Sequence, residues 1–460
     1  MLISGCDWSD RWLDFVVVGQ GGAVLAERRI VYADSPDPVA EYQGFLASLD
    51  RRWRGTVTGI EDPNVLFARA LLNAGMTVVH VDPARAARHR GVVGGPKTDR
   101  ADAALIADLV RQGVCRPVIE ASAGAQALRV VTLAHRHAVD ARMQTAHALR
   151  AALMKIWPAA VSAWPSTRGG LSTPQALAVM TAAPGPRAAQ ALTRARLADI
   201  LTQAGRTRAV TAEAERLHLH FRRPAMLLDP RIEDGESVRI RHLVHTLAGT
   251  VAQASALEGE MLTHYRRQHH HSLTAAIPGI GHILGAYLLA EIGDRPVERY
   301  GSGRALAAYA GVAPTTWASG VVVRVSVRRA AATYLQRTLH TAAFSLCSHS
   351  PGAQAYYQKR RDAGDTHRTA LRKVARRLVL CLYHCMVAGA DYDDAIAFGY
   401  TADSPEAPAL RRRQPPLNEE QIRLALAMLS APGGTVTGTA RALKVSGQTI
   451  YRHVLGTRER

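Results

Sequence analysis

The chain is short of aromatic residues, acidic residues, paired cysteines and long apolar runs, and each shortage excludes something. The five cysteines are scattered and contain no CxxC pair. This argues against a disulfide framework or a structural zinc site and fits a reducing compartment. No run of about 18 uncharged apolar residues occurs, so we expect no transmembrane span.

The shortage of acid leaves a large positive charge. Lys and Arg number 57 against 38 Asp and Glu, which gives a formal net charge of +19. A chain this basic most often binds a polyanion, and nucleic acid is the first candidate. A membrane surface is a weaker candidate, because aromatic residues are only 5% of the chain and we find no long basic helix with an aromatic face. The first residues contain no charged n-region and no apolar h-region, so we expect no signal peptide and a cytoplasmic location.

The first 115 residues alternate strand-like and helical segments. Three short strand-like runs separated by turn residues predict a meander, and two further strands alternate with helices. The strands are expected at 3–7, 14–18, 24–31, 56–60 and 77–81, and the helices at 38–49 and 64–73. This order predicts an α/β domain with a mixed sheet.

A loop that contains glycine and proline runs into a short acidic helix. Gly94-Gly95-Pro96 breaks regular structure, Thr98 is a good N-cap, and 101–109 is a helix-forming run. Asp99 and Asp102 are three residues apart, so both carboxylates lie on one helix face. Such carboxylates repel each other unless water or a cation lies between them, and oxygen ligands of this kind suit Mg²⁺. The plainer alternative is that these acids only complement the helix dipole.

Two more acids fall at the ends of expected strands. Asp7 ends the first strand and Glu61 follows the fourth. Sites in open α/β sheets lie at the carboxyl ends of strands. Four converging acids could therefore hold two divalent ions for in-line phosphoryl transfer. Acids at strand ends can also be solvated turn residues, which is our interpretation of Asp10, Asp62 and Asp82.

The acidic set resembles a known family. Asp7, Glu61 and the string Lys97-Thr-Asp-Arg-Ala-Asp102 are similar to the DEDD site of RuvC-like nucleases with a ribonuclease H fold. More closely, they resemble the transposases of the IS110 insertion-sequence group. The resemblance implies a catalytic site that binds Mg²⁺ or Mn²⁺, with flanking basic residues that contact nucleic acid. The acids would be Asp7, Glu61, Asp99 and Asp102, and the basic residues Lys97 and Arg100.

A second block, within residues 274–390, carries a glycine hairpin. Ala276-Ile-Pro-Gly-Ile-Gly-His282 lies between two expected helices and resembles the hairpin of helix-hairpin-helix DNA binders. The backbone N–H groups of Gly279 and Gly281 would meet phosphate there, although an ordinary capping turn explains the motif equally well. Further helices are expected at 284–292, 304–311, 331–348 and 367–388, and a basic strand-like run at 321–329.

The same block resembles the C-terminal domain of these transposases, through its Pro-Gly-Ile-Gly, Glu-Ile-Gly-Asp, Ala-Tyr-Ala-Gly-x-x-Pro and Ser-Gly motifs. In that family the serine of Ser-Gly attacks the scissile phosphate, which implies that Ser319 is the nucleophile. A serine needs activation, and a metal site could supply it. A plain turn at Ser319-Gly320 is the alternative. The glycine usual after this serine is absent, so Ser326 is a rival nucleophile, while Arg324, Arg328 and Arg329 keep a charge that would bind nucleic acid.

The middle of the chain predicts long helices, at 121–157, 192–204 and 238–267. An antiparallel hairpin, of coiled-coil type and used for self-association, fits this pattern. The resemblance implies a linker between two catalytic halves that helps to build an oligomer, a dimer or a tetramer. His269-His270-His271 looks like a metal tract, but adjacent residues on a helix do not face one point, so we interpret it as a polar, solvated patch.

The tail after a linker at 391–416 predicts three short helices, at 419–429, 437–443 and 448–454. They resemble the helix-turn-helix of Hin-type recombinases. A small protein-interaction module is the alternative. In the helix-turn-helix interpretation, the residues that face DNA are Gln448, Thr449, Tyr451 and Arg452.

Together these patterns predict an α/β ribonuclease-H-like (RuvC-like) domain followed by mostly α-helical coiled-coil and transposase domains, with a small C-terminal helix-turn-helix. The expected boundaries are 1–115, 116–270, 271–390, 391–416 and 417–460. The expected function is that of a transposase or site-specific recombinase that acts on DNA, and the family implies guidance by a structured bridge RNA. Rival hypotheses are a metal-only junction nuclease, a DNA invertase and a non-enzymatic helix-turn-helix regulator.

Overall fold

The computed structural model describes residues 1–93, 98–319, 322–327, 331–399, 419–430 and 435–443. The chain divides into two units, Met1–Glu120 and Ala121–Arg460. Several predicted site residues lie outside the described residues: Lys97, Arg328, Arg329, Gln448, Thr449, Tyr451 and Arg452.

The first unit is built on a six-stranded mixed sheet in the order β3-β2-β1-β4-β5-β6. Antiparallel pairing joins β3, β2 and β1, parallel pairing joins β1, β4 and β5, and β6 pairs antiparallel with β5. The sequence predicts the first five strands correctly, while β6 was not expected. The bounds are β1 (Ile3–Trp8), β2 (Trp12–Val18), β3 (Val24–Val31), β4 (Val57–Ile60), β5 (Thr77–His80) and β6 (Arg116–Pro117).

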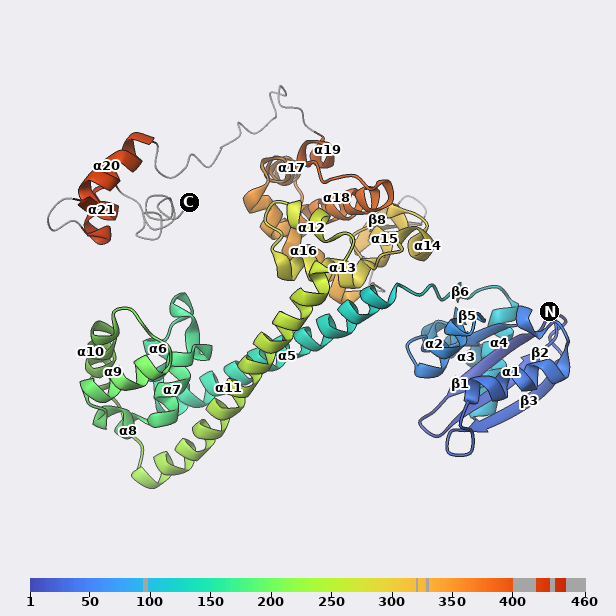
Figure 1. Ribbon diagram of the computed structural model, residues 1–460, viewed down its shortest axis with the longest axis horizontal. Coiled ribbons are helices and arrows are strands. Elements are labelled where there is room, and N and C mark those ends of the chain that lie inside the picture. The colour runs from blue at the N-terminus through green and yellow to red at the C-terminus, as the bar shows by residue number, and fades with distance from the viewer. Residues whose placement is uncertain (94–97, 320–321, 328–330, 400–418, 431–434, 444–460) are drawn as a thin grey trace. The chain divides into compact units, whose positions relative to one another are not determined.

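Helices cover both faces of this sheet (Figure 1). In β2, Leu13 and Phe15 belong to the core under α1 and α2, whereas Val16 and Val18 pack with Ala103 of α4 on the opposite face. Burial on both faces explains why β2 is a nearly continuous apolar run. The helices are α1 (Pro38–Leu49), α2 (Leu66–Asn73), α3 (Pro83–Val93), which was not predicted, and α4 (Asp99–Arg111).

Two glycines let α4 lie unusually close to the sheet. Gly5 of β1 and Gly59 of β4 are register partners in the parallel pair. A Cβ atom on Gly5 would lie 2.0 Å from the carbonyl oxygen of Ala103, and one on Gly59 would lie 2.4 Å from a methyl group of Val110. Neither position can carry a side chain unless the helix moves, so this glycine pair sets the height of α4 above the strands.

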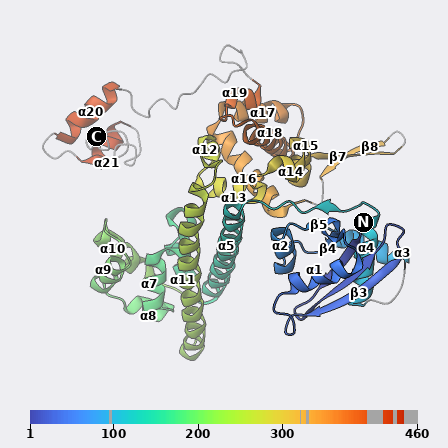
Figure 2. The same cartoon turned by 45° about the vertical axis from the view of Figure 1, so that its right-hand side comes forward.

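The second unit begins with two long helices, α5 (Ala123–Ile156) and α11 (Pro230–Arg266), which pack side by side and run in opposite directions (Figures 1 and 2). The predicted helical hairpin is therefore present, and its coiled-coil character stays a prediction. The segment between them folds around a core that includes Trp157, Trp164 and Phe221. Its helices are α6 (Pro158–Ala163), α7 (Pro174–Ala182), α8 (Pro186–Ala191), α9 (Arg194–Gln203) and α10 (Val210–Phe221).

A second helical core follows α11, and it includes Leu128 of α5 and Met261 of α11. A two-stranded ribbon of β7 (Pro314–Ser319) and β8 (Val322–Val327) interrupts the helices. The predicted helices are present, and three short ones, α14, α17 and α19, were not expected. The bounds are α12 (His271–Ala276), α13 (His282–Ile292), α14 (Pro296–Tyr300), α15 (Gly303–Tyr309), α16 (Thr333–His349), α17 (Pro351–Asp362), α18 (His367–Ala388) and α19 (Asp394–Phe398).

The tail contributes α20 (Glu419–Ser430) and α21 (Val436–Ala442), which pack through Ala425, Leu429 and Val436. They match the first two helices predicted for a helix-turn-helix. The expected third helix lies outside the described residues. Among the described helices, none combines the length and hydropathy that crossing a bilayer requires.

Candidate functional site

The fold of the first unit brings the four predicted acids to one edge of the sheet. Strands β1 and β4 pair in parallel up to Cys6 and Ile60, so Asp7 and Glu61 come next on neighbouring strands, about 5 Å apart along the sheet. Helix α4 packs over β1, β2 and β4. The Thr98 side chain accepts from Ala101 N at 3.2 Å, which confirms the predicted N-cap. The first turn of α4 therefore carries Asp99 and Asp102 to the same edge.

The acids interact electrostatically. Burial, followed in order of size by the negative charges of Asp102, Asp99, Glu61 and Asp14, raises the pKa of Asp7 to about 6. Each additional like charge makes a second ionised carboxylate more costly unless a cation is present. The negative charges of the predicted set therefore act on Asp7, and its role as a metal site stays a prediction.

Protein donors hold one oxygen of each acid on α4. Trp12 Nε1 donates to Asp99 Oδ2 at 3.0 Å, and Arg29 Nη2 lies 3.6 Å from the same oxygen. Arg90 Nη2 donates to Asp102 Oδ1 at 2.6 Å. Arg100 pairs with Glu27 at 2.7 Å while its side chain stays largely exposed, and its contact with nucleic acid stays a prediction.

A fifth acid stands beside the four and was missed by the sequence reasoning. Asp14 is the register partner of Asp7 and is 7% exposed. Both of its oxygens accept from Arg29, at 2.9 and 2.6 Å. The sequence contains a signal for Asp14, because this residue is an acid within an otherwise apolar strand. A carboxylate buried in such a strand requires a partner.

The ribbon of the second unit positions the predicted nucleophile. Ser319 is the last residue of β7 and pairs with Val322, the first residue of β8. Trp317 pairs with Arg324. Because residues two apart in a strand share a face, Ser319 and Arg324 occupy positions on the same face of the ribbon. Gly320 lies outside the described residues, so the plain turn at Ser319-Gly320 stays an alternative to the nucleophile.

The glycine hairpin is held by α16. Gly279 has φ +75°, and its carbonyl accepts from Ser345 Oγ at 2.6 Å. A Cβ there would lie 2.7 Å from His349 Nδ1, so Gly279 faces protein. Gly281 is exposed, and a Cβ added there would meet no atom within 4 Å in the described part of the chain. Phosphate contact thus suits Gly281 better than Gly279, and it stays a prediction for both.

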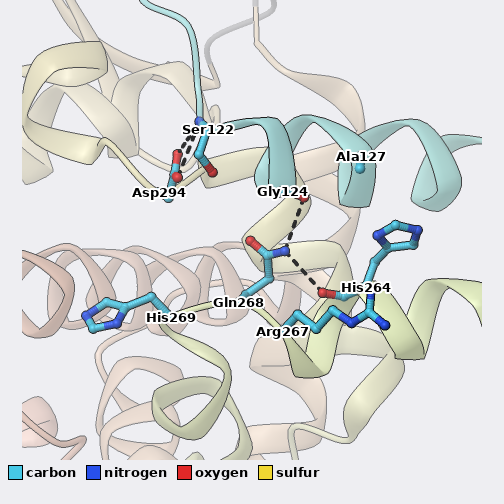
Figure 3. Close-up of a pocket in the computed structure, with 8 residues that line it drawn as sticks. All are labelled: Ser122, Gly124, Ala127, His264, Arg267, Gln268, His269 and Asp294. Atoms are coloured by element: carbon cyan, nitrogen blue, oxygen red, sulfur yellow. Dashed lines mark hydrogen bonds between the residues drawn. The ribbon is translucent and has the colours of Figure 1, made fainter.

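A cavity of about 410 Å³ lies where the end of α11 meets the start of α5 (Figure 3). Asp294, of the Glu-Ile-Gly-Asp motif, accepts from the backbone N of Ser122 at 3.1 Å. Burial would raise the pKa of Asp294, but the hydrogen bonds from Ser122 lower it overall. The start of α5 is therefore already capped by a carboxylate. The lining residues are Ser122, Gly124, Ala127, His264, Arg267, Gln268, His269 and Asp294.

The histidine tract is only partly a solvated patch. His269 is exposed, as expected, but the His271 ring packs edge-on against Tyr265 with centroids 4.6 Å apart. Within the ranges that the structure describes, no group of three or more His, Cys, Asp or Glu side chains has an arrangement that could hold a metal ion.

Comparison with known proteins decides the family. Residues 271–358 match the family described as "Transposase IS116/IS110/IS902 family", and residues 4–158 match a second family described as "Transposase". The "Mini-circle putative transposase for IS117" of Streptomyces coelicolor is 35% identical over 86% of this chain and 96% of that protein. The chain belongs to the IS110 family of transposases. It is also 27% identical to the "Insertion element IS900 uncharacterized 42 kDa protein" of Mycobacterium paratuberculosis, over 74% of this chain and 85% of that protein.

The transposase is thus an enzyme that cleaves and transfers DNA strands, and its DEDD-type domain implies dependence on a divalent metal. The donors fit such an ion in kind, because the cluster at α4 consists of carboxylates, the ligands that Mg²⁺ and Mn²⁺ prefer. The charges of Asp102, Asp99 and Glu61 act on Asp7, but among the described residues these acids are not gathered closely enough to form a metal-binding group.

Proposed function

We propose that this transposase cuts and joins DNA through a serine nucleophile, assisted by a divalent-metal site at Asp7, Glu61, Asp99 and Asp102 and directed by a bound RNA. The observation that carries the proposal is the convergence of the four acids at the start of α4, in a chain whose family is that of insertion-sequence transposases. Mg²⁺ or Mn²⁺, when bound, would polarise the phosphate and stabilise the leaving oxygen.

Ser319 is the proposed nucleophile. Its hydroxyl oxygen forms a bond to the scissile phosphorus, the bond from phosphorus to the 3′ oxygen breaks, and the serine proton ends on that oxygen. The products are a 5′-phosphoserine and a free 3′ hydroxyl, and the reverse step joins a new end. Arg324 shares a face of the ribbon with Ser319 and would bind the phosphate as a charge-assisted donor.

The rest of the basic surface would hold nucleic acid. A net charge of +19 suits binding to a polyanion, and the structured guide RNA itself is what the family resemblance implies. Sequencing the nucleic acid that co-purifies with the transposase tests this: one discrete RNA species supports guidance, and protein free of RNA at low salt contradicts it. A homo-oligomer built through α5 and α11, and a DNA contact made by the tail, complete the proposal.

The metal site is tested by changing each acid singly to its amide and assaying cleavage and joining of element-end DNA. We expect Asp7→Asn, Glu61→Gln, Asp99→Asn and Asp102→Asn each to lower the rate by at least about 10²-fold. Asp10→Asn and Asp62→Asn are matched controls, since Asp10 is solvent-exposed and Asp62 caps its own loop at Asn64. Full cleavage by Asp102→Asn would contradict the metal site, and no cleavage by any variant, wild type included, would favour the non-enzymatic regulator.

Two enzymatic alternatives differ in their products. A metal-only junction nuclease would direct water onto the phosphate, so it would never form a bond between protein and DNA. A DNA invertase would share the site and differ only in substrate, rejoining two sites within one molecule. Mapping the joined ends separates inversion from insertion, and covalent trapping separates both from the nuclease.

A further inference from the structure

Three residues enclose Asp99 in a way that the proposed function does not use. We call Trp12, Asp14 and Arg29 the Asp99 bracket. Asp14 holds the Arg29 guanidinium through both carboxylate oxygens. The guanidinium carbon lies 4.4 Å from the centre of the Trp12 ring, and the indole N–H of that ring donates to Asp99 Oδ2 at 3.0 Å.

We propose that Trp12 is a positioning residue for the metal-binding carboxylate of Asp99, and that Asp14 and Arg29 fix the Trp12 ring. The inference rests on the proposed role of Asp99 as a metal ligand. Outer hydrogen bonds of this kind orient ligating side chains and typically change metal affinity about 10–100-fold.

The need for such a partner follows from the place of Asp99. Its side chain is 47% exposed on the first turn of α4, so an unrestrained carboxylate would sample several rotamers. The bracket engages only Oδ2. Oδ1 accepts no hydrogen bond from the described residues, which leaves one oxygen for a cation.

The chemistry of tryptophan suits the task. An indole N–H donates but cannot accept and carries no charge. It therefore orients the carboxylate without neutralising it. A cationic donor in the same place would compete with an incoming metal ion. Arg29 lies farther from Asp99 Oδ2, at 3.6 Å, and its closest contacts are to Asp14.

Asp14 belongs to the bracket and is not a fifth ligand. Both of its oxygens are engaged by Arg29, and the residue is 7% exposed. A guanidinium held over an indole face within about 6 Å is attracted to it. The buried acid thus fixes the cation, and the cation fixes the ring.

The experiment measures Mn²⁺ binding to the full-length protein by the electron paramagnetic resonance signal of free Mn²⁺. Trp12→Phe keeps an aromatic ring at this position and changes no charge, and it removes the N–H donor together with part of the ring. We expect its Kd for Mn²⁺ to rise about 10-fold or more, with an unchanged melting temperature. Trp8→Phe is the matched control, because Trp8 ends β1, is 40% exposed and makes no hydrogen bond through its indole within the described ranges.

The Mn²⁺ assigned to the site is the part of the total binding that wild type shows and Asp99→Asn lacks. If Asp99→Asn loses it and Trp12→Phe binds as wild type does, the bracket is overturned and the metal site stands. If Asp99→Asn binds Mn²⁺ as wild type does, the metal site and the bracket both fail. A second readout is rescue: high Mn²⁺ should restore cleavage by Trp12→Phe and not by Asp99→Asn, and equal failure of both would contradict a positioning role.

Discussion

At the scale of single residues, the charge cluster lowers the stability of the fold mainly through Asp7. Its pKa is about 6 when folded, against 3.8 for an unperturbed aspartate, so the folded state holds its proton more tightly. The stability contributed by protonated Asp7 is present below about pH 4 and is lost as the pH rises through about 6. With divalent ions chelated, the first unit should therefore become less stable as the pH rises between those values.

Asp7→Asn should remove this penalty. In EDTA we expect the variant to be more stable than wild type by about 1–2 kcal/mol above pH 7, after allowing for solvent screening, and equal to it below about pH 4. Urea unfolding of the full-length chain, read by limited proteolysis within Met1–Glu120, measures the difference. A difference in unfolding free energy between variant and wild type that does not change with pH would contradict the charge cluster.

The four acids could be predicted at the residue scale because strand ends and helix starts are local features of the sequence. The residues that hold them could not. Trp12 reaches Asp99 across 87 positions, and no spacing rule links such a pair. Arg29 meets Asp14 as its register partner across β2 and β3, a pairing that follows only once the register of the two strands is known. Arg90 was missed together with its helix, α3, whose arginine-rich sequence lacks a clear apolar face.

At the scale of elements, the position of α4 on the sheet decides where Asp99 and Asp102 lie. Gly5→Ala would place a methyl group against the backbone of Ala103. We expect a loss of about 3 kcal/mol, because overpacking against backbone is relieved only by moving the helix. Binding of Mn²⁺ should weaken with it, since Asp99 and Asp102 move with α4.

Gly44→Ala is the control for this prediction. Gly44 lies within α1, where an added Cβ meets nothing within 4 Å. Alanine there should be neutral or slightly stabilising by helix propensity. Urea unfolding compares the two variants, and similar losses in both would show that the close approach is unimportant.

A buried arginine ties α5 to the core of the second unit. Arg136 is 8% exposed, donates to Thr338 Oγ1 at 2.8 Å and lies over the Tyr287 ring at 4.0 Å. Arg136→Met should destabilise the second unit by about 3 kcal/mol, because the polar partners stay buried without their donor. Urea unfolding is the measurement. Arg150→Met, at an exposed position of the same helix, should be nearly neutral.

At the scale of the whole molecule, the sequence predicted elements better than their assembly. The alternation of strands and helices in the first unit predicted its mixed sheet, since the hydrophobic periods of strands and helices differ clearly. The sequence did not predict all of the small helices α6 to α10, because the glycine- and proline-rich segments that connect them resemble one long loop. Only the packing of Trp157, Trp164 and Phe221 shows that this segment has a core.

The net charge of +19 makes DNA affinity depend on salt. If about six phosphates are contacted, affinity should fall about 10³-fold between 50 and 200 mM monovalent salt, through the release of condensed counterions. Fluorescence anisotropy with a labelled element-end duplex measures the slope. An affinity independent of salt would contradict a phosphate-dominated interface.

The most direct test of the account is covalent trapping of cleaved DNA. Wild-type transposase and Ser326→Ala should each yield a protein–DNA adduct that mass spectrometry maps to a 5′-phosphoserine at 319, and Ser319→Ala should yield none. An adduct at another residue, or DNA cleavage by Ser319→Ala at the wild-type rate, would contradict it.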